Sequence, residues 1–249
     1  MKHIAWFSAG VSSAVATKLV LNEIDEIVYT HIEDQHPDTL RFLHDCEGWY
    51  GRGITMLQSP LGSVENACFA AGGRGYVNGP GGAPCTMRLK RRVRKEYERQ
   101  QTQPLVYYWG MDASPKEIAR ASRLREDMPQ FEHRFPLIEQ GITKRSAHAM
   151  LLTAGIDRPK MYELGYGNNN CIGCVKGGMG YWNKIRQDFP EVFAARAAME
   201  RIIGGTCIKG VYLDELEPTR GRKELPIVAD CDSFCDTMAG EGGMQNDQL

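Results

Sequence analysis

The stretch His3-Ile4-Ala5-Trp6-Phe7, followed by Ser8-Ala9-Gly10-Val11-Ser12-Ser13-Ala14, decides how the rest of the chain is interpreted. Its apolar first half predicts a buried strand. Its second half predicts a tight turn at Gly10 and a helix over residues 14–21, capped by the two serines. Free N–H groups at the start of such a helix favour an anion. Taken alone, the stretch favours an ordinary strand-to-helix turn with a serine cap, because small residues are common in such turns.

Strand-like and helix-like segments alternate through the first half of the chain. Further strands are expected at residues 26–30, 53–57, 105–109 and 132–135, and helices at 38–50 and 115–125. This order predicts an α/β protein with a doubly wound parallel sheet. Ligands of such sheets bind at the carboxyl ends of the strands, where residues 8–13, 30–36 and 110–114 would converge. Beyond residue 144 the chain is expected to be helical with irregular connections.

Composition narrows the classes of function. The 249 residues carry a net charge of −1, so no global field attracts DNA or membranes, and a nucleic-acid contact would need a local patch. No signal peptide and no bilayer-length apolar run is visible, so we expect a cytoplasmic protein without membrane contact. Eight cysteines then indicate thiols or metal ligands rather than a disulfide framework.

Residues 8–13 resemble the pyrophosphate loop, S-G-G-x-D-S, of the adenine nucleotide alpha-hydrolase-like (PP-loop) enzymes. That superfamily includes the phosphoadenylyl-sulfate (PAPS) and adenylyl-sulfate (APS) reductases, ATP sulfurylases and tRNA thiolation enzymes. Ala9 replaces a glycine of the pattern and Ser12 an aspartate. The resemblance implies phosphate binding by Ser8, Ala9, Gly10, Ser12 and Ser13. Residues 31–39 are similar to the family segment D-T-G-x-x-x-x-E-T, which implies adenine contacts at Thr30, His31 and Ile32.

Two further segments carry the resemblance. Residues 110–123 are similar to the family segment after the fourth strand, which implies that Gly110 approaches the nucleotide and that Arg120 or Arg123 binds an anion. A surface salt-bridge ladder with Glu117 is the alternative. Residues 85–90 resemble the C-T-x-x-L-K motif of the reductase-like members, which implies catalytic roles for Cys85 and Lys90.

A strongly basic stretch follows this motif. Leu89, Val93 and Tyr97 recur every four residues and predict a core-facing stripe. Arg88, Arg92, Lys95 and Arg99 share another face, which we interpret mainly as a solvated charged surface. Contact with nucleic-acid phosphates is the alternative.

Cys171-Ile172-Gly173-Cys174 lies in a loop rich in Asn and Gly and predicts a metal or cluster site. A redox dithiol or unreactive thiols are the alternatives. The resemblance to cluster-carrying APS reductases implies a [4Fe-4S] cluster on Cys85, Cys171 and Cys174, with a fourth ligand from Cys231, Cys235 or a non-cysteine group. Alternatively, Cys231 and Cys235 join the C-x-x-C pair in a zinc site.

Together these segments are similar to stand-alone members of the PAPS reductase family, of the kind that travels with phages and CRISPR loci. The resemblance implies a Rossmann-like nucleotide-binding core at 1–140, a helical, cysteine-containing part at 141–239 and a flexible tail at 240–249. It also implies binding of ATP, PAPS or APS and the activation or transfer of sulfur. The reductases' E-C-G-x-H segment does not occur here. An accessory nucleotide-binding protein with altered catalysis is therefore the alternative. Expected partners are a nucleic acid or a sulfur-donor protein, with a homodimer as a further expectation.

Overall fold

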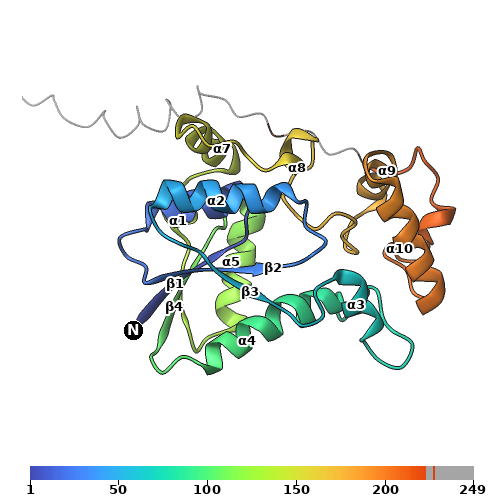
Figure 1. Cartoon of the computed structure of the whole chain (residues 1–249), viewed down its shortest axis with the longest axis horizontal. Coiled ribbons are helices and arrows are strands. Elements are labelled where there is room, and N and C mark those ends of the chain that lie inside the picture. The colour runs from blue at the N-terminus through green and yellow to red at the C-terminus, as the bar shows by residue number, and fades with distance from the viewer. Residues whose placement is uncertain (223–226, 228–249) are drawn as a thin grey trace, which may run out of the picture.

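A computed structural model describes residues 1–222 and residue 227 of the chain. The expectations for Cys231, Cys235 and the tail at 240–249 lie outside the described residues. Figure 1 shows a sheet with helices on both faces and a separate group of helices beside it.

The sheet has five parallel strands in the order β3-β2-β1-β4-β5. The strands are β1 Lys2–Phe7, β2 Glu26–His31, β3 Thr55–Gln58, β4 Leu105–Trp109 and β5 Glu132–Arg134. The predicted α/β class with a parallel sheet is confirmed. β3 forms one edge of the sheet, and the carboxyl ends of β1, β2 and β4 meet at the same side, as parallel pairing requires.

The helices follow the alternation expected from the sequence. They are α1 Val11–Leu19, α2 Asp38–Tyr50, α3 Val64–Phe69, α4 Arg92–Arg99, α5 Pro115–Asp127, α6 Pro136–Glu139, α7 Lys144–Thr153, α8 Lys160–Glu163, α9 Met179–Asp188 and α10 Pro190–Ile203. A π-helix, η1 Thr86–Arg91, runs directly into α4, and a 3-10 turn, η2 Leu213–Glu215, follows α10. None of the helices within the described residues combines the length and apolar character needed to cross a bilayer.

Alternate residues of each strand pack on opposite faces of the sheet. Ala5, Ile27 and Tyr108 face a core shared with α1, α2 and α7. Ile4 and Tyr107 face the other side, where α4 packs through Tyr97. Helices thus cover both faces of the sheet. A ligand can therefore approach the sheet from the side where the carboxyl ends of the strands lie.

A second core lies beside the sheet and consists of α3, α9, α10 and the segment that carries the C-x-x-C pair (Figure 1). Its largest fully buried side chain is Trp182. Ile32, from the end of β2, and Leu89, from η1, also belong to it. Elements from before and after residue 140 therefore contribute to both cores, since α7 packs against α1 over the sheet.

Candidate functional site

The loop between β1 and α1 is held closed by one of its own serines. The Ser13 hydroxyl accepts hydrogen bonds from the Ser8 and Gly10 amides, at 3.1 and 3.3 Å, and donates to the Gly10 carbonyl at 2.8 Å. Ala9 lies in the left-handed region, with φ of 56°, and is fully buried. The helix begins at Val11 with Gly10 as its N-cap, so the expected start at residue 14 with serine caps is wrong.

The backbone N–H groups in the first turn of α1 differ in whether they already have a hydrogen-bond partner. The Val11 amide donates to the Tyr162 hydroxyl over 3.4 Å. Ser12 and Ser13 are the next residues of α1, and amides in a first turn have no partner within their own helix. The Ser12 and Ser13 amides, unlike those of Ser8 and Gly10, are thus donors that the Ser13 hydroxyl leaves unoccupied.

Gly110, at the end of β4, permits the close packing of this loop against the sheet. A Cβ atom at position 110 would lie 2.3 Å from Cα and 2.7 Å from Cβ of Ser13. No side chain larger than hydrogen fits there without displacing the start of α1. The glycine expected near the nucleotide therefore also has a direct packing role.

A pocket of about 240 Å³ opens at the carboxyl ends of β1, β2 and β4, and we call it the strand-end pocket. Its lining consists of Trp6, Phe7, Ser8, Tyr29, Thr30, Gln35, Lys90, Arg91, Arg94, Trp109, Gly110, Met111 and Arg120. Four of these side chains are cationic and none is acidic. Such a lining suits an anion with several charges, because guanidinium groups match phosphate and sulfate geometry.

Two stacked indoles form an apolar wall of the strand-end pocket. The rings of Trp6 and Trp109 lie 6.3 Å apart at an angle of 17°. The Trp109 Nε1–H donates to Nδ1 of His133 at 3.0 Å, and His133 Nε2 lies 2.9 Å from the Met128 carbonyl. Both contacts are satisfied by a neutral imidazole, and burial lowers the pKa of His133, so its ring fixes the orientation of Trp109 without adding charge.

The structure brings only some of the predicted nucleotide contacts to this pocket. Ser8, Thr30, Gly110, Arg120 and Lys90 line it. Ala9, Gly10, Ser12 and Ser13 form the loop beside Ser8 without lining the pocket, and Ile32 lines a neighbouring one. His31 is half-buried, with Nδ1 3.4 Å from the Tyr29 hydroxyl, and Arg123 is exposed on α5. Arg120 also pairs with Glu117 at 3.1 Å, as the salt-bridge alternative expected.

A second pocket of about 360 Å³ contains the three cysteines proposed as ligands, and we call it the cysteine pocket. Cys85, Cys171 and Cys174 line it although 86 positions separate the first two in sequence. Lys90, Lys116 and Lys176 line it as well. Lys90 thus belongs to both pockets, and it is the side chain that connects them.

Two of the three thiols in the cysteine pocket have raised pKa values. Burial raises the pKa of the Cys171 thiol to about 12, although the nearby Lys90 charge opposes this effect. Burial and the neighbouring Cys174 raise the pKa of Cys85. Across residues 1–222 and 227, no group of three or more His, Cys, Asp or Glu side chains is arranged to hold a metal ion. Thiolate chemistry at Cys85 or Cys171 would need a metal or a base to remove the proton.

Buried polar contacts fix the segment that carries Cys171 and Cys174. Arg196 of α10 forms an ion pair with Asp34, and its Nε–H donates to the Gly173 carbonyl at 3.3 Å. The Ile172 amide donates to the Asp34 carbonyl at 2.7 Å. The Tyr181 hydroxyl accepts from the Cys174 amide at 2.9 Å and donates to the Cys171 carbonyl at 3.0 Å. The cysteine segment is therefore attached both to α9 and α10 and to the end of β2.

One side chain links the two pockets through the backbone. The Asn169 amide group donates to the Ala9 carbonyl at 2.7 Å and to the Thr39 hydroxyl at 3.2 Å. Asn169 lies two positions before Cys171, so the loop after β1 and the cysteine segment are in direct contact. Neither Asn169 nor Arg196 was predicted from the sequence, because both contacts join positions more than 150 residues apart.

Comparisons with known proteins assign the chain to no family. No protein-family model matches it, and no curated protein matches it significantly. The fold and the site define an α/β protein with a five-stranded parallel sheet, a cationic pocket at its strand ends and an adjoining cysteine-lined pocket.

Proposed function

We propose that this protein binds an adenine nucleotide, ATP, PAPS or APS, in the strand-end pocket and activates or transfers sulfur in the cysteine pocket. The observation that carries the proposal is the position of Lys90, which lines both pockets. A phosphate or sulfate bound beside Lys90 would lie next to the thiols. Membership of the PAPS reductase family, within the adenine nucleotide alpha-hydrolase superfamily, is part of the same proposal.

Nucleotide binding is supported by the chemistry of the pocket wall. Lys90, Arg91, Arg94 and Arg120 offer positive charge to phosphate or sulfate groups, while Trp6 and Trp109 offer an aromatic surface to a purine ring. The first-turn amides of α1 add backbone donors at the same edge of the sheet. Positive groups fixed in place before the reaction would stabilise negative charge that develops on the transferred group.

The donor set of the cysteine pocket has the chemistry of a soft-metal site, because thiolates are the ligands that zinc and iron–sulfur clusters prefer. Cys85, Cys171 and Cys174 would hold a [4Fe-4S] cluster or, alternatively, zinc, after loss of their protons. A bound cluster would supply electrons or a sulfur attachment point. Lys90, Lys116 and Lys176 would offset the negative charge of the thiolates.

A second candidate function is that of a nucleotide-binding accessory protein with altered catalysis, acting in a phage, CRISPR or nucleic-acid modification system. Two observations favour it. The Ser8 and Gly10 amides already bond to Ser13, and burial holds the pKa of Cys171 at about 12, so neither loop nor thiol is in an activated state.

Calorimetry on anaerobically purified protein tests the nucleotide site. Titration with ATP, PAPS and APS should show binding of at least one of them. Lys90→Gln should weaken that binding by about tenfold or more, because it removes a charge-assisted contact. Lys95→Gln is the matched control, since Lys95 lies on another face of the same helix and lines neither pocket.

The sulfur step is tested separately by metal and sulfide analysis and by turnover of radiolabelled PAPS or ATP. Iron and sulfide that are lost in Cys171→Ser support the cluster, and zinc in their place supports the alternative metal. Nucleotide binding without turnover would favour the accessory function. Absence of binding to all three nucleotides, in wild-type protein that is folded by circular dichroism, would contradict the proposal.

A further inference from the structure

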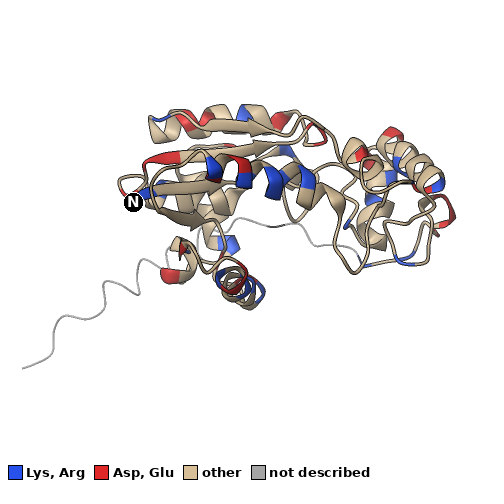
Figure 2. Cartoon of the chain, turned by 90° about the horizontal axis from the view of Figure 1, so that it is seen from below, with Lys and Arg blue, Asp and Glu red and all other residues tan. Residues whose placement is uncertain are grey.

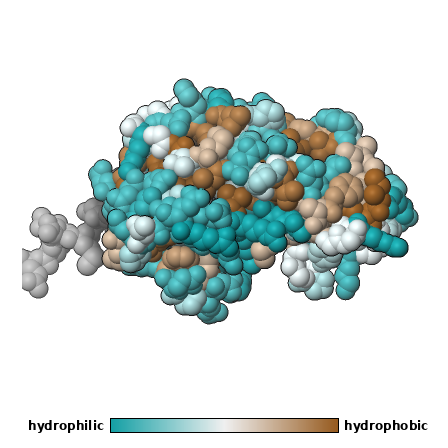
Figure 3. Space-filling view, turned by 60° about the horizontal axis from the view of Figure 1, so that its bottom comes forward, coloured by the Kyte–Doolittle hydropathy of each residue, from teal (hydrophilic) through white to brown (hydrophobic). Residues whose placement is uncertain are grey.

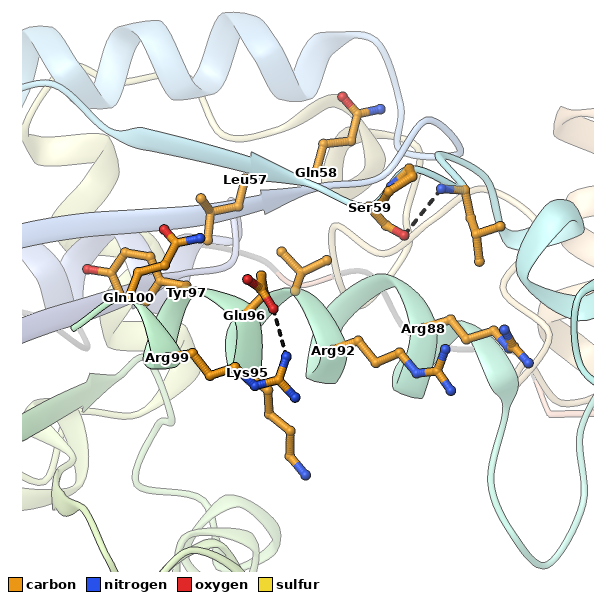
Figure 4. Close-up of a pocket in the computed structure, with 13 residues that line it drawn as sticks. Leu57, Gln58, Ser59, Arg88, Arg92, Lys95, Glu96, Tyr97, Arg99 and Gln100 are labelled. Atoms are coloured by element: carbon orange, nitrogen blue, oxygen red, sulfur yellow. Dashed lines mark hydrogen bonds and ion pairs between the residues drawn. The ribbon is translucent and has the colours of Figure 1, made fainter.

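A third pocket, larger than the two described above, lies on the other side of the basic helix, between α4 and the edge strand β3. It has a volume of about 620 Å³. Its lining consists of Leu57, Gln58, Ser59, Pro60, Leu61, Arg88, Arg92, Val93, Lys95, Glu96, Tyr97, Arg99 and Gln100. We call it the basic groove. Figure 4 shows β3 along one side and the helix, with its basic side chains, along the other.

Four cations line the basic groove in helical order. Arg88, Arg92, Lys95 and Arg99 follow one another at intervals of three or four residues, so they lie along one face (Figure 4). Arg99 pairs with Glu96 at 2.7 Å. Arg88, Arg92 and Lys95 form no ion pair within the described part of the chain. Three of the four charges are thus available to a partner.

This charge is a local feature of the molecule. Residues 88–99 contain seven basic and two acidic side chains, whereas the whole chain has a net charge of −1. Figure 2 shows the basic positions recurring along α4 in the view from below. An uncompensated row of this kind attracts a polyanion, because each phosphate that it neutralises releases condensed counterions.

The wall of the groove is partly apolar. Leu57 and Leu61 from the end of β3 and Val93 from α4 line it between the cations. Figure 3, in which this side of the molecule comes forward, shows hydrophobic patches set among a hydrophilic surface. Cationic and apolar groups side by side match a ligand that alternates negative charges with flat apolar rings.

We propose that the basic groove binds single-stranded nucleic acid, with phosphates along the cation row and bases against the apolar wall. The row spans about 16 Å of helix, enough for several phosphates of one strand. Single strands expose the faces of their bases, which stack on apolar and aromatic surfaces. A duplex hides those faces, and an acidic peptide lacks them, so the apolar wall favours a single strand over both.

The groove is distinct from the nucleotide site. Arg88, Arg92 and Lys95 line the groove, while Lys90, Arg91 and Arg94 line the strand-end pocket on another face of the same continuous helix. Strand binding therefore does not rest on the proposed function, and it is measured without any mononucleotide. If both proposals hold, a strand bound in the basic groove lies on the other side of the helix from the cysteine pocket. A nucleic-acid acceptor of the transferred sulfur would need to lie close to that pocket.

Fluorescence anisotropy tests the proposal with labelled oligo-U and oligo-dU of about twelve nucleotides, which differ only in the 2′-hydroxyl. The key variant combines Arg88→Gln, Arg92→Gln and Lys95→Gln. Removal of three phosphate contacts should weaken binding on the order of 100-fold at about 100 mM KCl and reduce the slope of log K against log salt by about 2. The control combines Arg74→Gln, Lys209→Gln and Arg220→Gln, which removes the same charge from exposed positions elsewhere. The control should bind like the wild type.

The comparison of the two oligonucleotides identifies the natural strand, since preference for oligo-U indicates contact with the 2′-hydroxyl. Three results would overturn the proposal. The first is that neither oligonucleotide binds the wild type. The second is that the control variant loses as much affinity as the groove variant. The third is that a duplex of the same length, or polyglutamate, binds as tightly as the strands. Thermal unfolding of both variants should match that of the wild type, which checks that the substitutions leave the fold intact.

Discussion

The sheet and the cysteine segment are held in place by different means. Residues of β1 pair with both neighbours over most of their length, and their side chains alternate between two cores. Residues 164–178, between α8 and α9, contain neither helix nor strand. A few buried polar side chains, above all Arg196, Asp34 and Asn169, position this segment instead.

This difference predicts where single substitutions matter. Periodic structure distributes stability over many similar contacts, each of which contributes a small net free energy. A segment held by a buried ion pair depends on the few groups that satisfy each other. We therefore expect the largest effects of polar substitution around the cysteine segment and smaller ones around the loop after β1.

The largest effect is expected for Arg196→Met. The side chains of Arg196 and Asp34 are 5% and 11% exposed, so removal of the cation leaves a buried carboxylate without its partner. We expect the free energy of unfolding to fall by about 3–5 kcal/mol, measured from urea denaturation.

Arg201→Met on the same helix is the matched control. Arg201 pairs with Asp214 and Glu215 at 2.7 and 2.6 Å, but its side chain is 43% exposed. Exposed pairs contribute little, so this variant should lose about 1 kcal/mol or less. Equal losses in the two variants would show that burial of the ion pair does not anchor the segment.

The free energy of unfolding should depend on pH through His148, a buried histidine beneath the loop after β1. His148 of α7 is 2% exposed, packs edge-on against Tyr162 and has no hydrogen-bond partner among the described residues. Burial, with help from Arg158 and Lys144, lowers its pKa from 6.5 to about 4. Between these values the unfolded chain binds a proton that the folded protein does not. The free energy of unfolding should therefore fall as the pH drops from 6.5 to 4, by on the order of 3 kcal/mol for this group.

Denaturation curves of His148→Leu across that pH range give the decisive comparison. The variant should lose most of the slope and retain the stability of the wild type at pH 7, because no hydrogen bond is removed. His44→Leu, on the exposed side of α2, should keep the wild-type slope. An unchanged slope in His148→Leu would assign the pH dependence to other groups.

The smallest effect is expected within the loop itself. Ser13→Ala removes the oxygen that accepts from the Ser8 and Gly10 amides, and water replaces it at the exposed Ser8. We expect a loss of about 1 kcal/mol in thermal or urea unfolding. Ser12→Ala, at a half-buried neighbour whose hydroxyl makes no hydrogen bond among the described residues, should change stability by less than about 0.5 kcal/mol. A larger effect at Ser12 would contradict the arrangement of the loop.

The same contrast explains which parts of the fold the sequence predicts. The helix at 38–50 and the strand at 105–109 have the expected bounds, because their apolar spacing reflects the face they bury. Leu89 and Tyr97 of the predicted stripe are buried in the two cores, whereas Val93 between them is half-buried and lines the basic groove. The short helices α3, α6 and α8 were not predicted, since four to six residues are too few to show a periodicity.

The part of the candidate site that follows directly after the strands could be predicted from the sequence. Parallel strands bring Ser8, Thr30 and Gly110 to one edge, so their positions follow from the order of elements. The meeting of Cys85 with Cys171 and Cys174 in one pocket followed from family resemblance, not from periodicity. Contacts such as Asn169 with Ala9 leave no local pattern, and no spacing in the sequence could have indicated them.

The π-helical start of the basic helix has a consequence for how this protein could change. A π turn accommodates an extra residue, and each residue of an α-helix turns the chain by about 100°. Deletion of one residue between Thr86 and Leu89 would convert η1 Thr86–Arg91 into regular α-helix. Cys85 would then rotate by about 100° about the helix axis, while Arg92 and Lys95 kept their positions. One small deletion would thus separate the thiol from the cation row while leaving both sets of side chains in the sequence.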